Sequence, residues 1–317
     1  MIKILANDGI NSDGKLLLEE AKYVVNTTKI PQEELAAKLP EYDSIIVRSA
    51  TKVRKELIDQ CPNLKIIARA GVGMDNIDVE YARSKGIKVM NTPRASSQAV
   101  AELVFGQMFT LSRFLHISNR EMPLRGNTDF KALKKQFSAG SQLRGKTLGI
   151  IGFGRIGQEL ARLAAGIGMR VLPTDLEEKQ VELMITPPDH PDVSLAIRSQ
   201  TVSLSKVLRE SDYISIHVPG GKLIGADELA KMKDGVRLVN TARGGVIDEE
   251  ALLDALNSGK VAGAAIDVFE NEPTPRQAIL DHPNISLTPH IGASTVEAQR
   301  NIGLELADAL IDFFGTD

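Results

Sequence analysis

A glycine-rich turn is the part of the sequence whose residue types and spacing point most directly to chemistry. The apolar run 147–151 ends in Gly152-Phe-Gly154-Arg-Ile-Gly157, and leucines and alanines then recur at helical spacing. After a strand, such glycines permit a tight turn, let a pyrophosphate approach the backbone and let the helix pack closely on the strand. The free N–H groups of the helix start would face the phosphates. The motif predicts dinucleotide binding by Gly152, Gly154, Arg155, Ile156 and Gly157.

An acidic residue stands where such a site needs one. Asp175 lies 18 residues beyond Gly157, just after the next apolar run. Its carboxylate can accept hydrogen bonds from the hydroxyls of an adenosine ribose. The residues that follow are Leu176, Glu177 and Glu178, with no arginine among them, and their acidity would repel a 2′-phosphate. The sequence therefore predicts NAD rather than NADP as the cofactor.

Polar side chains follow three later apolar runs. Arg243 comes after 237–240, the acids Asp267, Glu270 and Glu272 come after 262–266, and His290 comes after 285–288. Ligands of open α/β sheets bind beyond the carboxyl ends of the strands, so these side chains are expected to face one site. Either Glu270 or Glu272 could partner the histidine, and a lone histidine in such a place is more often structural than catalytic.

Together with these segments, three N-terminal motifs make the chain resemble a known family. They are VRSATKV at 47–53, RAGVGMDN at 69–76 and MNTP at 90–93. The chain resembles the D-isomer-specific 2-hydroxyacid dehydrogenases over essentially its whole length. Within that family it is most similar to the short-form D-3-phosphoglycerate dehydrogenases.

The resemblance implies a catalytic set of Arg243, Glu272 and His290, with Glu272 preferred to Glu270. Oxidation of a 2-hydroxy acid removes a hydride from C2 and a proton from the hydroxyl group. A histidine, which titrates near neutral pH, is suited to take that proton. The carboxylate would fix the imidazole tautomer, and the arginine fork would grip the substrate carboxylate and polarise the C2 oxygen.

The resemblance also implies further contacts with both ligands. Asp267 would bind the nicotinamide carboxamide, and His217 would line the cofactor cleft unless it only caps its strand. The full cofactor set adds Val218, Pro219, Thr241, Ala242 and Gly292. For the substrate, the main-chain amides of Val72 and Gly73 would hold the carboxylate, because glycine lets a ligand come close.

Two arginines suggest a phosphorylated substrate. Arg48 and Arg69 match phosphate-contacting positions of the family, Lys52 lies near Arg48, and Lys134 and Lys135 could add charge. A guanidinium pair suits a phosphate dianion, although both arginines could be ordinary surface residues. The predicted reaction is NAD-dependent oxidation of D-3-phosphoglycerate to 3-phosphohydroxypyruvate, the first step of serine biosynthesis. The alternatives are a glyoxylate or hydroxypyruvate reductase and, in another class, an NAD-sensing binding protein.

Alternating apolar runs and helical patterns predict the fold class as α/β, with two doubly wound parallel sheets of Rossmann or flavodoxin type and a cleft between them. The substrate-binding domain is expected at 1–97 plus 293–317, and the NAD-binding domain at 98–292. A long helix should follow Pro93, and 119–142 should be a loop with a short helix. The stretch 182–201, with Pro187, Pro188 and Pro191, is interpreted as an irregular surface insertion.

Composition excludes several other classes. Charged residues make up 25% of the 317 residues and the formal net charge is −3, which does not indicate a nucleic-acid partner. The single cysteine, Cys61, allows no intrachain disulfide. No signal segment or membrane-length apolar run is found, so a cytoplasmic location without membrane partners is expected. No metal site is expected, and a homodimer is expected through the second domain and the helix near 99–118.

Overall fold

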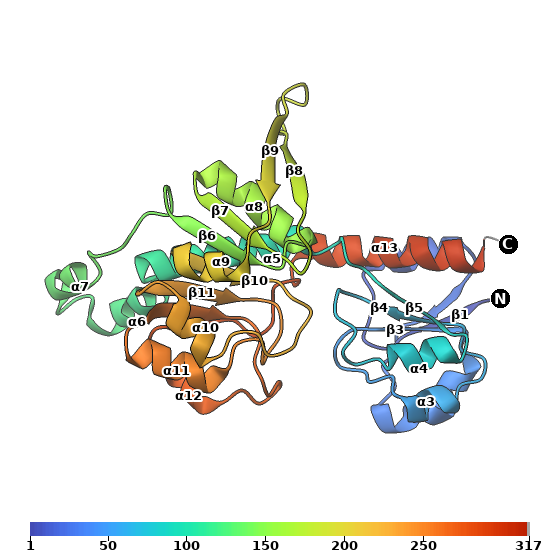
Figure 1. Ribbon diagram of the computed structural model, residues 1–317. Coiled ribbons are helices and arrows are strands. Elements are labelled where there is room, and N and C mark those ends of the chain that lie inside the picture. Colours follow the sequence, from blue (N-terminus) through green and yellow to red (C-terminus); the bar gives the residue numbers. More distant parts are fainter. Residues whose placement is uncertain (316–317) are drawn as a thin grey trace. The chain divides into compact units, whose positions relative to one another are not determined.

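The computed structural model describes residues 1–315, which fold as two compact units (Figure 1). Unit 1 comprises Met1–Ser97 together with the chain from Ala293 onward, and unit 2 comprises Gln98–Gly292. Each unit is built on one parallel sheet with helices on both faces, which confirms the predicted fold class.

The sheet of unit 1 has five strands in the order β2-β1-β3-β4-β5, all paired in parallel. This is the flavodoxin-like order, in which ligands bind at the carboxyl edge. Short apolar runs form these strands because both faces of the sheet are covered. Their bounds are β1 Lys3–Ala6, β2 Val24–Asn26, β3 Ser44–Val47, β4 Ile66–Arg69 and β5 Lys88–Asn91.

Two apolar cores cover the faces of this sheet. Ile4 and Ala6 point to the side of the long C-terminal helix, while Leu5 points to the other side. Gly14 and Gly303 let the first and last helices of the unit touch backbone to backbone, because a Cβ at Gly14 would overlap the carbonyl of Gly303. The helices are α1 Ser12–Glu20, α2 Leu35–Lys38, α3 Lys55–Asp59, α4 Val79–Ser84 and α13 Val296–Phe314, with 3₁₀ turns η1 Gln32–Glu34 and η2 Leu39–Glu41.

The main sheet of unit 2 has six parallel strands in the order β13-β12-β11-β10-β6-β7. The chain starts this sheet at β6, adds β7 on one side of it and then adds β10 to β13 on the other side. Doubly wound sheets bind nucleotides at the point where the strand order reverses in this way. The bounds are β6 Thr147–Ile151, β7 Arg170–Thr174, β10 Tyr213–Ile216, β11 Val236–Asn240, β12 Val261–Ile266 and β13 Ile285–Leu287.

Helices cover both faces of this sheet as well. Ile150 belongs to the core under α5 and α8, whereas Ile151 belongs to the core on the opposite face. The helices are α5 Ser97–Arg113, α6 Leu115–Arg125, α7 Phe130–Gln136, α8 Arg155–Ile167, α9 Leu204–Glu210, α10 Ala226–Lys231, α11 Glu249–Asn257 and α12 Gln277–Asp281.

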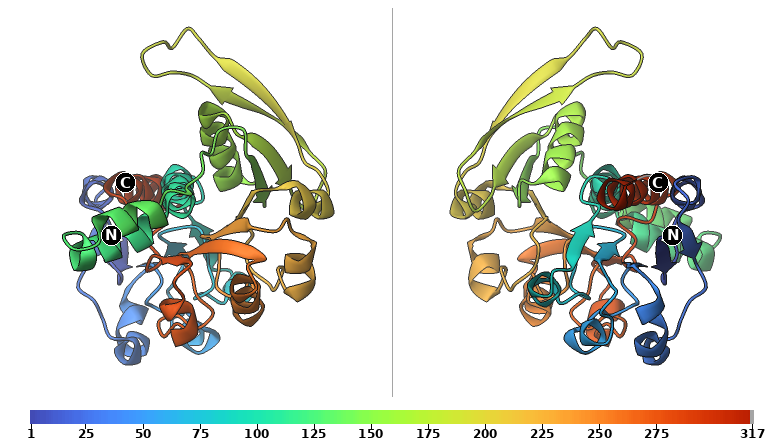
Figure 2. Two further views of the ribbon diagram at one scale, coloured as in Figure 1. Left: turned by 90° about the vertical axis from the view of Figure 1, so that its left-hand side faces the viewer. Right: turned by 90° about the vertical axis from the view of Figure 1, so that its right-hand side faces the viewer.

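Two expectations about irregular segments were wrong. The stretch 182–201 forms most of an antiparallel hairpin, β8 Gln180–Ile185 with β9 Leu195–Gln200, which stands out from unit 2 (Figure 2). Its three prolines all lie in the loop at the tip, so they limit the hairpin without interrupting its strands. The segment after residue 115 is also more helical than expected, because α6 continues to Arg125 with Pro123 inside it.

Within residues 1–315 no helix combines the length and the apolar character needed to cross a membrane. The same residues contain no cluster of three or more histidine, cysteine or acidic side chains arranged to hold a metal ion.

Candidate active site

The carboxyl ends of the six strands of unit 2 carry the predicted site residues in one row. Neighbouring parallel strands end at the same edge, so residues far apart in the sequence become neighbours in space. Following the sheet from β13 to β7, the strand ends lead into His290, Glu272, Arg243, His217, Gly152 and Asp175. The candidate catalytic residues therefore occupy one end of the row, and Asp175, the predicted ribose-binding acid, occupies the other.

The glycine turn has the local geometry that a pyrophosphate requires. Gly152 adopts a φ of 95°, and a side chain there would collide with the main chain of His217 on the adjacent strand end. A Cβ at Gly157 would overlap the carbonyl of Gly152, so this glycine lets α8 approach β6. A Cβ at Gly154 would meet none of the described residues within 4 Å. Gly152 and Gly157 are thus closely packed against neighbouring backbone, whereas the start of α8 at Gly154 is open. A phosphate needs this open space to reach the free N–H groups of the helix.

Asp175 supports the glycine turn as well as the predicted ribose site. One carboxylate oxygen accepts the Phe153 N–H at 3.0 Å, and the other accepts the Leu176 N–H at 2.8 Å. The Lys179 ammonium lies 2.5 Å from the first oxygen. Although burial opposes ionisation, the Lys179 contact and these N–H donors hold the pKa of Asp175 below its usual value. Asp175 is therefore ionised at neutral pH.

Two buried polar atoms lie at the ends of the central strands. His217 Nδ1 and Thr241 Oγ1 are inaccessible to solvent and have no hydrogen-bond partner within the part of the chain that the structure describes. His217 Nε2 lies 2.8 Å from the Ser215 hydroxyl, and burial lowers the pKa of His217 to about 3, so the ring is neutral. Buried polar atoms are rarely left unsatisfied. A bound nicotinamide nucleotide fits this edge, because its polar groups could satisfy such atoms.

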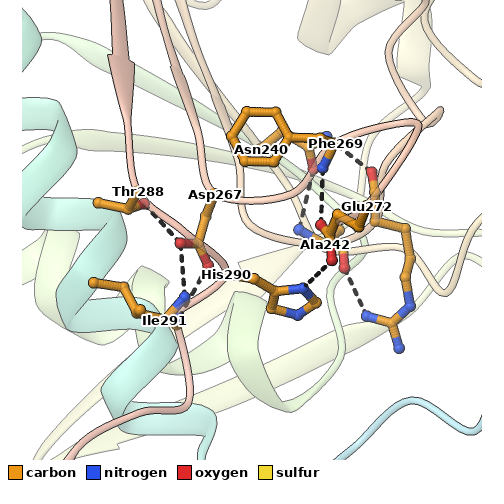
Figure 3. Close-up of polar contacts among 10 residues, drawn as sticks. Asn240, Ala242, Asp267, Phe269, Glu272, Thr288, His290 and Ile291 are labelled. Carbon is orange, nitrogen blue, oxygen red and sulfur yellow. Dashed lines mark hydrogen bonds and ion pairs between the residues drawn. The ribbon is translucent and has the colours of Figure 1, made fainter. Parts of the chain in front are cut away.

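His290 and Glu272 form a hydrogen-bonded pair in unit 2 (Figure 3). His290 Nδ1 lies 2.8 Å from Glu272 Oε2, while the Phe269 N–H donates to Glu272 Oε1 at 2.9 Å. The backbone of His290 has a φ of 54°, a left-handed conformation uncommon for residues other than glycine, which often marks functional sites. The Glu272–Pro273 peptide bond is cis. The His290 side chain is 48% exposed, so a small molecule can contact it.

The rival acid is engaged elsewhere. The Glu270 N–H donates to Glu249 Oε1 at 3.0 Å, and the Glu249 N–H donates to Glu270 Oε1 at 3.4 Å. Glu249 is almost fully buried, and burial together with the charge of Glu270 raises its pKa. This reciprocal contact fixes the main chain two residues before Glu272. The structure thus places Glu272, and not Glu270, beside the histidine.

The arginine is positioned by a residue that the sequence analysis did not single out. Asn240, the last residue of β11, accepts the Ala242 N–H and donates to the Arg243 carbonyl, both at 3.0 Å. Arg243 Nη1 donates to the Ala242 carbonyl at 2.6 Å. Gly244 lies directly against the Phe269 carbonyl, so the arginine loop and the glutamate loop are packed together. The sequence feature that could have revealed Asn240 is a polar residue at the end of an otherwise buried strand.

Asp267 is buried and holds the segments on both sides of His290. Its two oxygens accept hydrogen bonds from the Thr288 hydroxyl at 2.6 Å, the Ile291 N–H at 2.9 Å and the Gly292 N–H at 2.9 Å (Figure 3). These bonds determine where His290 stands. The expected carboxamide contact stays a prediction, and it would have to use the remaining acceptor capacity of this carboxylate.

The predicted substrate residues of unit 1 lie at the end of β4 or in the loops after β3 and β4. Arg48 lines a cavity of about 240 Å³ together with Asp8, Asn11 and Gln299. Arg69 instead folds back, since its Nη1 donates to the Ala70 carbonyl at 3.2 Å and lies against Gly71. The remaining members are Lys52, whose main chain pairs with Gln32, Val72, whose carbonyl accepts from Asn91, and Gly73. The structure does not bring both arginines to this cavity.

Comparisons with known proteins agree with this arrangement. Residues 105–292 match the model of the D-isomer specific 2-hydroxyacid dehydrogenase NAD binding domain. The hydroxypyruvate reductase of Thermotoga maritima is 44% identical over an alignment 322 residues long, which covers 99% of this chain and 98% of that protein. The D-3-phosphoglycerate dehydrogenase of Methanocaldococcus jannaschii is 40% identical over 98% of this chain, which spans 57% of that dehydrogenase.

Solved structures give the same result. The glyoxylate reductase from Paecilomyes thermophila superimposes with a TM-score of 0.80 at 31% identity, covering 98% of this chain and 94% of that one. A family match over most of unit 2, relatives of 40% identity or more and the row of strand-end residues all agree. The chain belongs to the D-isomer specific 2-hydroxyacid dehydrogenase family and is an NAD-dependent oxidoreductase.

Proposed function

We propose that the protein reduces a small unphosphorylated 2-oxo acid, hydroxypyruvate or glyoxylate, to the corresponding 2-hydroxy acid with NADH, giving the D-enantiomer from hydroxypyruvate. The observation that carries the chemistry is the 2.8 Å contact between Glu272 and His290, at the same carboxyl edge of the sheet as the glycine turn. Arg69 turned back onto its own backbone argues against a two-arginine clamp for a phosphate group. This replaces the phosphoglycerate oxidation expected from the sequence as the first candidate, and the 44% identical reductase supports the change.

The dinucleotide binds at the open face of the glycine turn in this proposal, with its ribose at Asp175 and its nicotinamide near Thr241 and Asp267. When bound, it supplies the hydride. Arg243 binds the substrate carboxylate and polarises the C2 carbonyl. His290, held through Nδ1 by Glu272, presents Nε2 to the C2 oxygen and donates the proton in reduction or accepts it in oxidation.

A substrate panel tests the substrate class. We expect the catalytic efficiency of NADH oxidation with hydroxypyruvate or glyoxylate to exceed that with phosphohydroxypyruvate by about ten-fold or more, because a site lacking paired cations gains little from a phosphate. Higher efficiency with phosphohydroxypyruvate would refute the proposed substrate and leave the reaction type intact.

Variants test the catalytic pair separately. His290→Ala should lower kcat/KM by about 10²–10⁴-fold, the usual contribution of a positioned general acid or base. His190→Ala, in the exposed hairpin tip, is the matched control and should behave as wild type. Near-normal turnover by His290→Ala would remove the proposed role of this histidine.

Oxidation of D-3-phosphoglycerate remains a second candidate because of one observation. The Arg48 side chain lines the 240 Å³ cavity at the carboxyl edge of the unit 1 sheet, where a phosphate could bind. If this candidate is correct, Arg48→Ala should reduce efficiency with phosphohydroxypyruvate far more than with hydroxypyruvate. Equal losses with both substrates would exclude a phosphate-specific role.

A homodimer is part of the proposal. Large apolar side chains of unit 2 are exposed along three consecutive helices: Phe109, Leu115, Met122, Leu124 and Phe130. Leu124 is 78% exposed, and an apolar surface of this kind favours a protein partner. Light scattering at micromolar concentration should give twice the monomer mass, and a monomer would contradict the proposal.

A further inference from the structure

The hairpin β8–β9 has a precise attachment to the edge of the nucleotide-binding sheet. The main chain of Lys179, the residue before β8, donates to the Thr201 hydroxyl at 2.8 Å, and the Thr201 N–H donates back to the Lys179 carbonyl at 3.0 Å. The Val202 N–H donates to the Pro173 carbonyl in β7 at 2.8 Å. The two ends of the hairpin are therefore tied to each other and to the strand that leads into Asp175.

This attachment holds a lysine against the ribose-binding acid. Lys179 Nζ lies 2.5 Å from Asp175 Oδ2, and both side chains remain partly accessible, at 37% and 22% exposure. The ammonium is a triple donor, and the contact with Asp175 accounts for one of its N–H groups. The Asp175–Lys179 pair carries no net charge. Without Lys179, the Asp175 carboxylate alone would face the expected 2′ position of the ribose.

We propose that Lys179 is a specificity-determining residue of the adenosine site, which lets the protein bind dinucleotides carrying a 2′-phosphate as well as those without one. A lone Asp175, followed by the exposed Glu177 and Glu178, would repel a 2′-phosphate. Lys179 cancels the nearest of these charges and offers N–H donors to phosphate oxygens. NAD remains the better ligand, because Asp175 still accepts hydrogen bonds from the ribose hydroxyls.

Residues 176–178 are acidic or apolar, and nothing in the sequence shows that the next residue turns back onto Asp175. The proposed role of Lys179 rests on the proposed binding of the dinucleotide at the glycine turn. The hairpin has a part in this role, because its base fixes the Lys179 backbone.

Binding measurements without substrate test the inference. The dissociation constants of NADH and NADPH are measured by the fluorescence of the bound nicotinamide for wild type, Lys179→Ala, Lys179→Arg and Lys260→Ala. Lys260 is the matched control, since it also forms a lysine–aspartate pair, at 2.7 Å with Asp234. This pair lies at the amino ends of β11 and β12, away from the carboxyl edge that carries Asp175. Calorimetry with 2′,5′-ADP and 5′-AMP, which lack nicotinamide, repeats the comparison for the adenosine end alone.

Lys179→Ala should weaken NADPH and 2′,5′-ADP binding about ten-fold, the usual effect of losing one charge-assisted hydrogen bond, and change NADH binding by less than about three-fold. Lys179→Arg should restore most of the loss, and Lys260→Ala should match wild type. An unchanged ratio of NADPH to NADH affinity in Lys179→Ala would overturn the inference while leaving the proposed function intact. Failure of wild type to bind either dinucleotide would overturn both.

Discussion

Mild acid should destabilise unit 2 through one buried imidazole, that of His217. Burial lowers the pKa of this ring to about 3, whereas an unfolded histidine titrates near 6.5. At pH values between these two pKa values, His217 binds a proton in the unfolded chain but not in the folded chain. The free energy of unfolding therefore falls as the pH drops below about 6.5, and this loss ends only near the folded pKa.

The size of the effect follows from the two pKa values. A pH of about 5 lies roughly 1.5 units below the pKa of histidine in the unfolded chain. At about 1.36 kcal/mol per unit, this interval corresponds to a loss of roughly 2 kcal/mol in the free energy of unfolding. Part of the His217 residue remains accessible even though Nδ1 is buried, so water can stabilise some of the charge. We therefore expect a loss of about 1–2 kcal/mol between about pH 7.5 and pH 5.

Urea unfolding of wild type and His217→Asn isolates this contribution, because every other titrating group is shared by the two proteins. Asparagine can keep a hydrogen bond to Ser215 but has no proton to gain. The difference in unfolding free energy between the two proteins should shift by about 1–2 kcal/mol in favour of the variant as the pH is lowered to about 5. Parallel pH profiles would refute the assignment of a neutral, buried ring to His217.

Four further substitutions have definite expected outcomes. Gly154→Ala should unfold like wild type, because its Cβ meets no described residue within 4 Å, yet bind NADH about ten-fold more weakly in a fluorescence titration. Gly157→Ala and Gly14→Ala would each drive a Cβ into backbone and should cost about 1–3 kcal/mol in urea unfolding, so wild-type midpoints would contradict the packing described here. Glu249→Gln should gain stability over wild type as the pH rises from about 5 to 8, since burial raises the pKa of Glu249 and its ionisation then favours the unfolded chain; a constant difference would argue against this.

Buried parallel strands were the features that the sequence predicted best. Thr147–Ile151 is a continuous apolar run covered on both faces, and its strand was predicted with the observed bounds. The strand Val24–Asn26 was missed because it is a three-residue edge strand with only one buried side chain. The hairpin was missed because three prolines suggested an irregular backbone for the whole segment, although all of them lie in its tip.

Site residues could be predicted where one strand end carries one polar side chain. His290 and Arg243 were therefore predicted as site residues from the sequence together with the family resemblance. The contacts that fix the loops of the candidate site could not be predicted, because they join segments that meet only in the folded chain. Glu249 bonds the main chain of Glu270, 21 residues away, and Lys179 bonds Asp175 across a turn whose conformation is set by the hairpin.

The hairpin that stands out from unit 2 also offers an engineering opportunity. Its tip, residues 186–194, is exposed throughout, and insertions at such tips usually leave the rest of a domain undisturbed. A circularly permuted fluorescent protein spliced there would be joined by two short strands to the place where the adenosine moiety is expected to bind. Such a chimaera could report the redox state of nicotinamide pools in living cells as a change in emission.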